Sequence, residues 1–268
     1  MPVSVLDGIL EGVREDLADR KRQVSQAELR SRVADKGPVR DPMPAFRSPE
    51  ISIIAEVKRK SPSKGALSDI PDPGLLASQY AAGGAAAISV LTERRRFGGS
   101  LADLDEVRSR VDIPILRKDF IVDPYQLWEA RAHGADLALL MVVSLSDTQL
   151  ADLLGLCAEL GLTALVESHT AEEVGRAIES GAQLLGINAR DLTTLEVDRS
   201  VFAELAPLIP EGIVRVAESG VAGPQDVAEY RSWGADVVLV GEALVRSRDP
   251  RTAVREFSQT PAASSPKN

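Results

Sequence analysis

The feature that most constrains the fold of this chain is an alternation of short apolar runs with longer amphipathic segments, repeated eight times. The apolar runs have the length of buried strands and occupy residues 51–58, 86–91, 113–118, 136–142, 162–167, 183–188, 213–218 and 236–240. Segments with helical spacing lie at residues 73–83, 100–110, 124–133, 147–160, 171–180, 198–207, 224–233 and about 242–257. Strand–helix–strand units cross over right-handed and make the strands parallel. Eight such units predict an α/β fold, a (β/α)₈ TIM barrel.

Residue pairs that favour helix boundaries punctuate this alternation. Glycine follows four predicted helices, in the pairs Gly84-Ala85, Gly134-Ala135, Gly181-Ala182 and Gly234-Ala235. Glycine accepts the left-handed conformation that ends many helices. Helix starts are predicted at the pairs Asp72-Pro73, Asp123-Pro124 and Asp249-Pro250, because an acidic cap and a proline in the first turn both favour a start.

About fifty residues precede the first predicted strand. Leu6, Ile9, Leu10, Val13 and Leu17 recur at three- and four-residue spacing, which predicts an amphipathic helix, and a weaker helix is predicted over 25–33. This N-terminal helical extension either caps the bottom or side of the barrel or shapes its mouth. We expect one domain over residues 1–258, with the extension over about 1–50, and a disordered tail over 259–268.

Composition excludes several classes of function. The 268 residues carry a formal charge of −9, which argues against non-specific nucleic-acid binding. The single cysteine, Cys157, excludes an intrachain disulfide, and its apolar neighbours predict a buried thiol. No apolar run approaches the roughly 20 residues of a membrane span. The N-terminus lacks the basic and apolar regions of a signal peptide, so a cytoplasmic protein is expected.

Charged and polar side chains close five of the predicted strands. Side chains two apart in a strand point the same way, so the inward face of the first strand turns from apolar to charged at Glu56 and Lys58. Lys118, Glu167 and Glu218 hold the same position in later strands, as does Asn188. A structural ion pair is the alternative for Glu56 and Lys58, but burying ions is costly. Because barrel active sites lie at the carboxyl ends of the strands, we interpret these side chains as one catalytic mouth.

Lys118 and Glu167 are the predicted acid–base pair. A lysine that is partly desolvated and near another cation has a lowered pKa, which suits a general acid near neutral pH. Glu167 closes the fifth predicted strand and is the opposing carboxylate.

The loops after the last two strands predict a phosphate site. Barrels often bind phosphate there, and Gly220 and Gly241 let backbone N–H groups approach an anion. Glu242 would repel phosphate through its side chain, so we assign it a backbone contact or a helix cap. The basic loop 59–65 is predicted to be a mobile lid, with a solvated run of charges as the alternative, and Ser61 is a candidate polar ligand.

Phe97 and Phe120 follow strand ends, where they either pack against an aryl ring or anchor their loops. His133 is placed at the C-terminal end of a helix. His169 follows Glu167 near the mouth, where it either supports a site residue or, as we favour, caps a helix with Thr170. No cluster at ligand spacing supports a metal site, and no nucleotide or dinucleotide motif is present, so no cofactor is expected.

Five motifs resemble those of the indole-3-glycerol-phosphate synthase family: Ala55-Glu-Val-Lys-Arg-Lys-Ser-Pro-Ser-Lys-Gly65, Leu116-Arg-Lys-Asp-Phe120, Leu165-Val-Glu167, Gly186-Ile-Asn-Ala-Arg-Asp-Leu192 and Ala217-Glu-Ser-Gly220. The resemblance covers nearly the whole chain and implies a (β/α)₈ barrel with an N-terminal extension over the active-site side. It implies the step of tryptophan synthesis in which 1-(2-carboxyphenylamino)-1-deoxyribulose 5-phosphate loses CO₂ and water and closes to indole-3-glycerol phosphate. It also implies a carboxy-lyase that needs no cofactor and acts as a monomer.

Site roles follow from the matched motifs. The resemblance implies that Lys118 is the general acid, that Glu167 assists proton transfer, and that Lys58 holds the substrate carboxylate or donates a proton. It implies that Glu56 and Asn188 orient these groups. The remaining residues implied to line the site or contact phosphate are Ser61, Arg190, Glu218, Ser219, Gly220 and Gly241. Leu139, Met141, Phe97 and Phe120 are candidates for an apolar slot that takes the aryl ring.

Two rivals are weighed against this interpretation. Phosphoribosylanthranilate isomerase is another phosphosugar barrel, but its family uses a cysteine and an aspartate, whereas the first strand here ends in Glu and Lys. A barrel that only binds a phosphometabolite would not require the inward pair Lys118 and Glu167.

Overall fold

The computed structural model describes residues 5–192 and 194–260 and contains a closed barrel of eight parallel strands. The barrel strands are β1 (Ser52–Val57), β4 (Ala87–Leu91), β5 (Ile115–Lys118), β6 (Leu137–Met141), β7 (Thr163–Ser168), β8 (Leu184–Asn188), β9 (Val214–Glu218) and β10 (Val237–Val240). Hydrogen bonds between β1 and β10 close the ring. The predicted (β/α)₈ barrel is confirmed.

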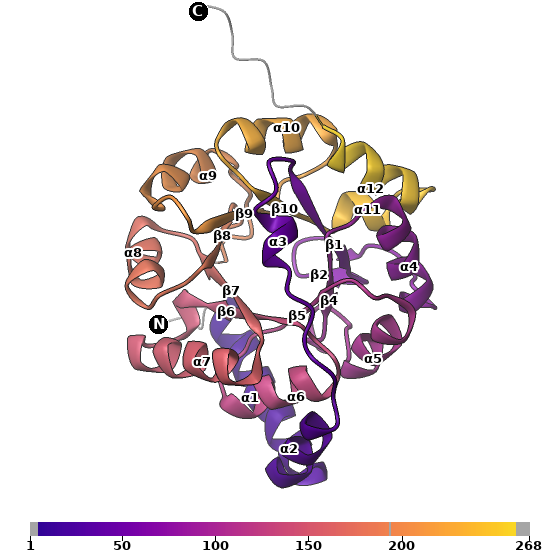
Figure 1. Cartoon of the computed structure of the whole chain (residues 1–268), viewed down its shortest axis with the longest axis vertical. Helices are drawn as coiled ribbons and strands as arrows, with labels where there is room; N and C mark the ends of the chain where they lie inside the picture. The colour runs from indigo at the N-terminus through magenta and orange to yellow at the C-terminus, as the bar shows by residue number, and fades with distance from the viewer. Residues whose placement is uncertain (1–4, 193, 261–268) are drawn as a thin grey trace, which may run out of the picture.

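Helices form an outer ring around these strands, as Figure 1 shows. They are α4 (Pro73–Gly83), α5 (Leu101–Arg110), α6 (Pro124–Ala132), α7 (Asp147–Leu160), α8 (Ala171–Glu179), α9 (Ser200–Leu205), α10 (Pro224–Ser232), α11 (Glu242–Val245) and α12 (Pro250–Ser258), with 3₁₀ turns η1 (Val142–Ser144) and η2 (Ala206–Leu208). Asp72, Asp123 and Asp249 cap their helices, and each is followed by proline in the first turn, as predicted. The glycines predicted at helix ends all have positive φ.

The last predicted helix, 242–257, is wrong as a single element. The chain forms α11, leaves helical geometry after Arg246, and restarts at α12. Asp249 accepts a hydrogen bond from the backbone N–H of Thr252, and Pro250 lacks the N–H that a continuous helix would need. The Asp-Pro start therefore overrides the longer helical pattern.

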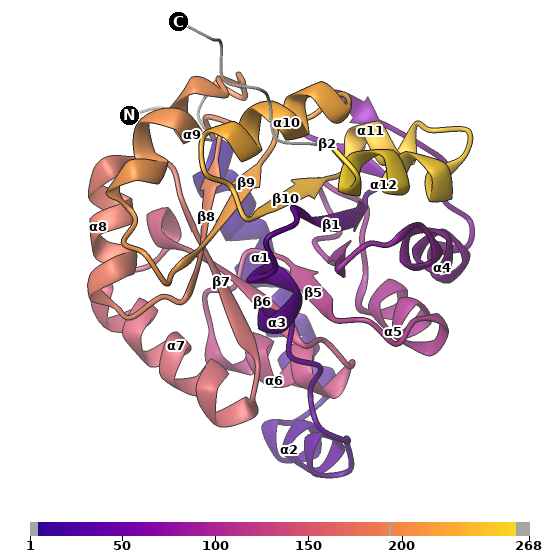
Figure 2. The same cartoon turned by 45° about the horizontal axis from the view of Figure 1, so that its top comes forward.

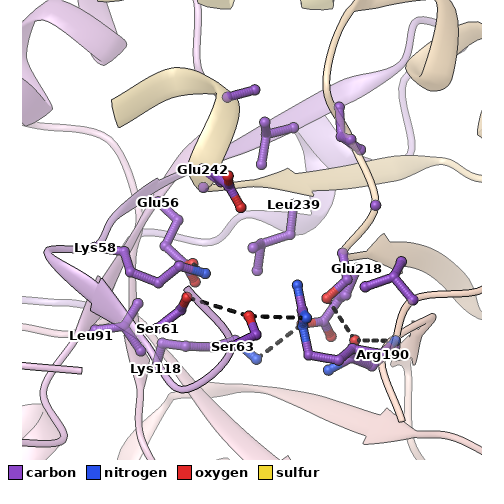
Figure 3. A pocket seen from close by; sticks show the side chains of 18 of the residues that line it. Glu56, Lys58, Ser61, Ser63, Leu91, Lys118, Arg190, Glu218, Leu239 and Glu242 are labelled. Carbon is purple, nitrogen blue, oxygen red and sulfur yellow. Dashed lines mark hydrogen bonds and ion pairs between the residues drawn. The ribbon is translucent and has the colours of Figure 1, made fainter. Parts of the chain in front are cut away.

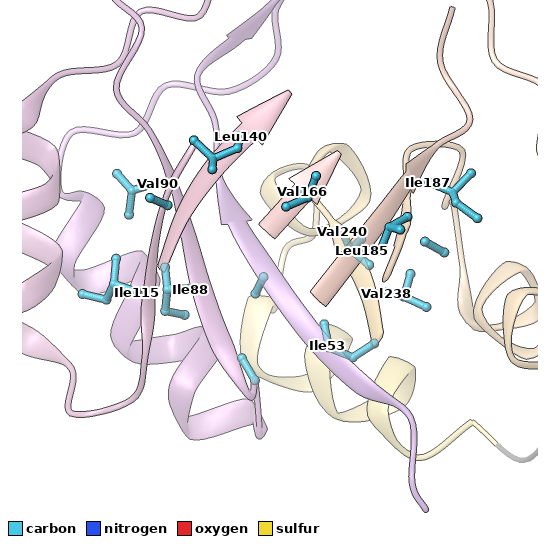
Figure 4. Packing of buried hydrophobic residues seen from close by; sticks show 14 of the residues in the cluster. Ile53, Ile88, Val90, Ile115, Leu140, Val166, Leu185, Ile187, Val238 and Val240 are labelled. Carbon is cyan, nitrogen blue, oxygen red and sulfur yellow. The ribbon is translucent and has the colours of Figure 1, made fainter. Parts of the chain in front are cut away.

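Alternating strand residues separate two apolar cores. Outward-facing side chains such as Ile53, Ile88 and Val238 pack between the strands and the outer helices, as Figure 4 shows. Inward-facing side chains such as Ile54, Leu116 and Leu165 fill the barrel. The barrel is thus a packed core whose polar groups lie at one end.

The N-terminal extension touches both ends of the barrel. It consists of α1 (Val5–Gln23), α2 (Gln26–Ala34) and α3 (Met43–Phe46). Phe46 of α3 is fully buried against the inward-facing core, and the hydroxyl of Ser52, at the start of β1, donates to the carbonyl of Ala45. In Figures 1 and 2, α3 crosses the near opening of the barrel and α1 lies behind it. The extension therefore closes the base through α3.

The other parts of the extension pack on the side and the mouth. Leu29 of α2 packs against Tyr125 and Ala132 of α6. Leu6 and Ile9 of α1 lie at the carboxyl ends of the strands. Of the placements weighed for the two predicted helices, the first helix is thus at the mouth and the second on the side.

The described chain starts and stops at opposite ends of the barrel. Val5 lines the cavity at the mouth. The carbonyl of Thr260 accepts a hydrogen bond from Arg231, which also donates to the carbonyl of Pro49, just ahead of β1. The predicted disordered tail falls largely on residues 261–268, which lie outside the described residues, as do residues 1–4.

Candidate active site

A cavity of about 1100 Å³ opens at the carboxyl ends of the barrel strands. Its walls include every side chain or glycine that the sequence singled out for the site, part of which Figure 3 shows. These residues are Glu56, Lys58, Ser61, Phe97, Lys118, Phe120, Leu139, Met141, Glu167, Asn188, Arg190, Glu218, Ser219, Gly220, Gly241 and Glu242. The structure thus brings all of them together at one rim.

Lys118 lies between two carboxylates from different strands. Its Nζ atom is 2.6 Å from Oε2 of Glu167 and 2.9 Å from Oε2 of Glu218. The side chains of Glu167 and Glu218 are almost completely buried, while that of Lys118 is 14% exposed toward the cavity. An ammonium group that reaches the cavity is therefore held by two shielded carboxylates.

The predicted lowering of the Lys118 pKa is wrong. Burial alone would lower this pKa, but Glu167 and then Glu218 outweigh burial, so the pKa of Lys118 is raised above its usual value. The cation that the sequence placed nearby, Lys58, is instead paired with Glu56. Lys118 is thus protonated at neutral pH, with carboxylates rather than a cation beside it.

The two carboxylates on Lys118 titrate in opposite directions. Burial would raise the pKa of Glu167, but Lys118 and His169 outweigh it and hold that pKa well below its usual range. Burial raises the pKa of Glu218 to about 8, against the opposing effect of Lys118. Near neutral pH, Glu167 is therefore ionised and Glu218 carries a proton, which provides both an acceptor and a donor.

A second ion pair closes the first strand. Oε1 of Glu56 is 2.8 Å from Nζ of Lys58, and Oε2 of Glu56 accepts a hydrogen bond of 3.1 Å from the hydroxyl of Ser89. A Cβ atom on Gly241 would lie 2.6 Å from Oε1 of Glu56. Glycine at that position therefore lets the loop after β10 approach the pair.

Asn188 and Ser219 are joined at the ends of β8 and β9. The hydroxyl of Ser219 donates to Oδ1 of Asn188 at 2.8 Å, and the same oxygen accepts the backbone N–H of Arg190 at 3.0 Å. Ser219 has a φ of 72°, a strained conformation for a residue with a side chain, and Tyr230 fixes it by donating to its carbonyl. Backbone strain of this kind is often found at functional sites, and here the strained residue directly precedes Gly220.

The predicted lid forms a short hairpin of β2 (Lys60–Ser61) and β3 (Gly65–Ala66). Figure 3 shows Ser61, Ser63 and Arg190 in a row, and Arg190 donates to Ser63 at 3.3 Å. Lys64 pairs with Glu242 at 2.8 Å, so the side chain of Glu242 is turned to a cation of the hairpin. The hairpin thus contacts the rim through Arg190, which follows β8, and through Glu242, which follows β10. Its mobility stays a prediction.

Apolar side chains form one wall of the cavity. The rings of Phe97 and Phe120 are 6.2 Å apart, and Leu139 and Met141 of β6 belong to the same core cluster. Ile9 of α1 lies in this cluster and lines the cavity. The extension therefore contributes to the apolar wall.

The sequence interpretation left two residues that shape the site out of its list of site residues. A Cβ atom on Gly186 would lie 2.3 Å from Oε1 of Glu218, so this glycine makes room for that carboxylate. A glycine inside a strand was the signal for such close approach. The helix cap favoured for His169 and Thr170 belongs to Thr170, the cap of α8. Nε2 of His169 faces Oε1 of Glu167 at 3.4 Å, which is the supporting position that the sequence left as its alternative. The sequence signal for this position was Glu173, four residues after His169, whose carboxylate contacts the imidazole at 3.1 Å.

Other features of the described residues bear on function. Within residues 5–192 and 194–260, no group of three or more His, Cys, Asp or Glu side chains could hold a metal ion. Across the same ranges, no helix has both the length and the apolar character needed to cross a membrane. Cys157 is buried, as predicted.

The barrel and its rim define a class. The rim has an ammonium group between carboxylates, a second lysine–glutamate pair, glycines in the last two loops and an apolar wall. These are features of TIM-barrel enzymes that act on phosphorylated substrates.

Comparisons with known proteins narrow this class. A model of the family "Indole-3-glycerol phosphate synthase" matches residues 6–257, and the chain belongs to that family. Indole-3-glycerol phosphate synthase 1 of Streptomyces coelicolor is 60% identical over 255 residues, which cover 95% of each chain. Indole-3-glycerol phosphate synthase of a Nocardioides species is 60% identical over 256 residues, covering 96% of this chain and 98% of the relative. The family consists of decarboxylating lyases of tryptophan biosynthesis.

Solved structures with little sequence similarity share the fold. The 3-hexulose-6-phosphate synthase of Salmonella typhimurium aligns with a TM-score of 0.65 at 17% identity, covering 78% of this chain and 98% of that one. At this identity the likeness supports the barrel fold alone.

Proposed function

We propose that this chain closes the indole ring of indole-3-glycerol phosphate by general acid–base catalysis centred on Lys118. The substrate is 1-(2-carboxyphenylamino)-1-deoxyribulose 5-phosphate, and the products are indole-3-glycerol phosphate, CO₂ and water. The observation that carries the proposal is the position of Lys118 between Glu167 and Glu218 at the mouth of the cavity.

Ring closure needs a proton at the ketose carbonyl. The aryl carbon that bears the carboxylate attacks this carbonyl, and its oxygen takes a proton from Lys118 as the C–C bond forms. The raised pKa keeps Lys118 protonated before the step. Glu167 and Glu218 hold the ammonium group in place, but they also make it a weaker acid, so its proton moves only as negative charge develops on the carbonyl oxygen. A positioned general acid contributes about 10²–10⁴-fold to rate.

Decarboxylation and dehydration complete the ring. The bond to the carboxylate breaks, CO₂ leaves, and its electrons restore the unsaturation of the ring system. The new hydroxyl group then leaves as water, which needs a proton at that oxygen and loss of a proton from the neighbouring carbon. Glu167, being ionised, is suited to accept the proton, and Lys58 is suited to hold the substrate carboxylate or to donate. Glu56 and Asn188 orient these groups through their contacts with Lys58 and Ser219.

The phosphate group is assigned to the loops after β9 and β10 and to the hairpin. Ser61, Ser219, Gly220 and Gly241 lie around this part of the cavity. Glu242 is assigned a backbone contact only, because its carboxylate faces Lys64 and Arg246. The aryl ring is assigned to the wall formed by Phe97, Phe120, Leu139 and Met141, and Arg190 and Glu218 line the remaining rim.

A turnover assay tests this function. Purified protein mixed with the carboxyphenylamino substrate, without added metal or nucleotide, is expected to produce the fluorescence of an indole, with one CO₂ released per product. Saturable binding of the substrate without any product would identify a binding protein and contradict the proposal.

The chain is further proposed to act as a single-domain monomer in the cytoplasm, the domain spanning residues 1–258. Continuity of the outer core from β1 to α12 supports one domain. Sedimentation or light scattering of the active protein is expected to give about the mass of one chain, 28.6 kDa. A stable mass of twice that value would contradict the monomer.

A further inference from the structure

His169 lies behind Glu167, on the side away from Lys118, and its side chain is 13% exposed. Its Nδ1 atom is 3.1 Å from Oε2 of Glu173, and its own backbone N–H donates to the same oxygen at 2.8 Å. Glu173 lies in the first turn of α8, where Thr170 caps its backbone N–H. The imidazole is thereby fixed with its other nitrogen, Nε2, 3.4 Å from Oε1 of Glu167, an ion-pair contact in which Nε2 has no hydrogen-bond partner among the described residues.

The two carboxylates that share Lys118 differ in one respect. Oε2 of Glu167 meets Lys118, and Oε1 of the same group faces His169. Oε2 of Glu218 also meets Lys118, but Oε1 of Glu218 is buried without a hydrogen-bond partner among the described residues. Glu167 thus faces two nitrogen groups, whereas Glu218 faces one.

Charges from every neighbouring element act on this arrangement. Glu167 of β7 faces Lys118 from β5, Glu218 from β9 and His169 from its own segment, while His169 also faces Glu173 from α8. Burial would lower the pKa of His169, but Glu167 and Glu173 outweigh it and raise that pKa to about 10. The group is an imidazolium below that pH and loses its charge as the pH rises through it.

We propose that His169, held as an imidazolium by Glu173, is a positioning residue that decides which carboxylate beside Lys118 is ionised. This inference rests on the proposed function, since it deepens the roles of Glu167 and Glu218 there. With the charge in place, Glu167 stays an acceptor and fixes its Oε2 on Lys118, and the shared proton of the pair resides on Glu218. Without the charge, the two carboxylates become similar competitors for that proton.

The chain offers a direct measurement, because His133 and His169 are its only histidines. Two imidazole signals in an NMR titration can be assigned with His133→Asn and His169→Gln. The ¹⁵N shifts of His169 are expected to be those of an imidazolium at pH 7, with a midpoint near pH 10. Glu173→Gln is expected to lower this midpoint. A neutral His169 at pH 7 would overturn the inference, whether or not the protein turns over substrate.

The pH profile of kcat/KM tests whether the charge of His169 controls the ionisation of Glu167 during turnover. His169→Gln keeps a hydrogen-bonding side chain of similar reach but removes the charge, so the pKa of Glu167 rises. The acid limb of the profile is then expected to move up by about one pH unit. His133→Asn, a matched change at the other histidine, which pairs with Asp105 at a helix end, is expected to leave the limb in place.

The outcomes separate this inference from the proposed function. An active wild type with an unmoved acid limb in His169→Gln would overturn the role of His169 and leave the ring-closing activity standing. A wild type without turnover would overturn the proposed function, and the NMR midpoints would still report on the ion pair.

Discussion

Replacement of Lys118 by alanine is expected to abolish measurable turnover, with a loss of about 10³-fold or more in kcat, because no other ammonium group takes its place between Glu167 and Glu218. The fold is expected to survive, since Glu167 keeps His169 at 3.4 Å and Glu218, whose pKa is raised to about 8, holds a proton in place of the lost cation. Indole fluorescence measures the activity, and far-UV circular dichroism measures the fold.

Lys118→Arg is the matched control for charge. Arginine restores a cation between the carboxylates but does not give up its proton in proteins, so this variant is expected to stay inactive while keeping the ion pairs. Near-normal turnover by a folded Lys118→Ala protein would remove Lys118 from the mechanism.

Replacement of the preceding residue, Arg117, by methionine is expected to lower the stability of the fold, whereas the Lys118 variant loses activity. Arg117 is fully buried on the outward face of β5. Its guanidinium donates to Asp119 at 2.9 Å, to Glu129 at 3.2 Å and to the hydroxyl of Thr92 at 3.1 Å. Removing the cation leaves the buried carboxylate of Asp119 without its ion-pair partner, whereas Glu129 keeps Arg20 at 2.7 Å. Loss of one partner of a buried ion pair costs about 3–5 kcal/mol of unfolding free energy.

Thermal or denaturant unfolding measures this loss. For a domain of this size, each kcal/mol lowers the melting temperature by about 2–4 °C, so a fall of roughly 10 °C is expected. Arg22→Met is the surface control, because Arg22 and its partner Asp19 are exposed, and it is expected to leave the midpoint unchanged. An Arg117→Met protein as stable as the wild type would show that the network does not hold this part of the barrel together.

Alternation along strands made the fold and the contents of the cavity predictable from sequence. Lys118 and Arg117 are neighbours in the chain, yet the two-residue period alone assigns the lysine to the inside. The same rule applied to Glu56, Glu167 and Glu218 places all of them at one rim, as the structure has it. The helix starts at the Asp-Pro pairs were also predictable, because helix capping depends only on residues that are adjacent in the sequence.

Charge states were not predictable, because they depend on distances between residues far apart in sequence. Glu218 lies 100 positions from Lys118, yet their atoms are 2.9 Å apart, and this contact helps to reverse the predicted shift of the lysine pKa. The place of His169 beside Glu167 depends on how β7 runs into α8. The position of the N-terminal extension likewise follows from tertiary packing, which helical periodicity does not encode.

The opposite placement of Val5 and Thr260 bears on how this protein is handled as a reagent. A fusion partner or immobilising tether attached beyond Thr260 starts at the closed pole of the barrel, where Arg231 and Pro49 lie. One attached ahead of Val5 starts beside the opening of the cavity. Attachment at the carboxyl side therefore leaves the mouth of the cavity unobstructed on a bead or a sensor chip.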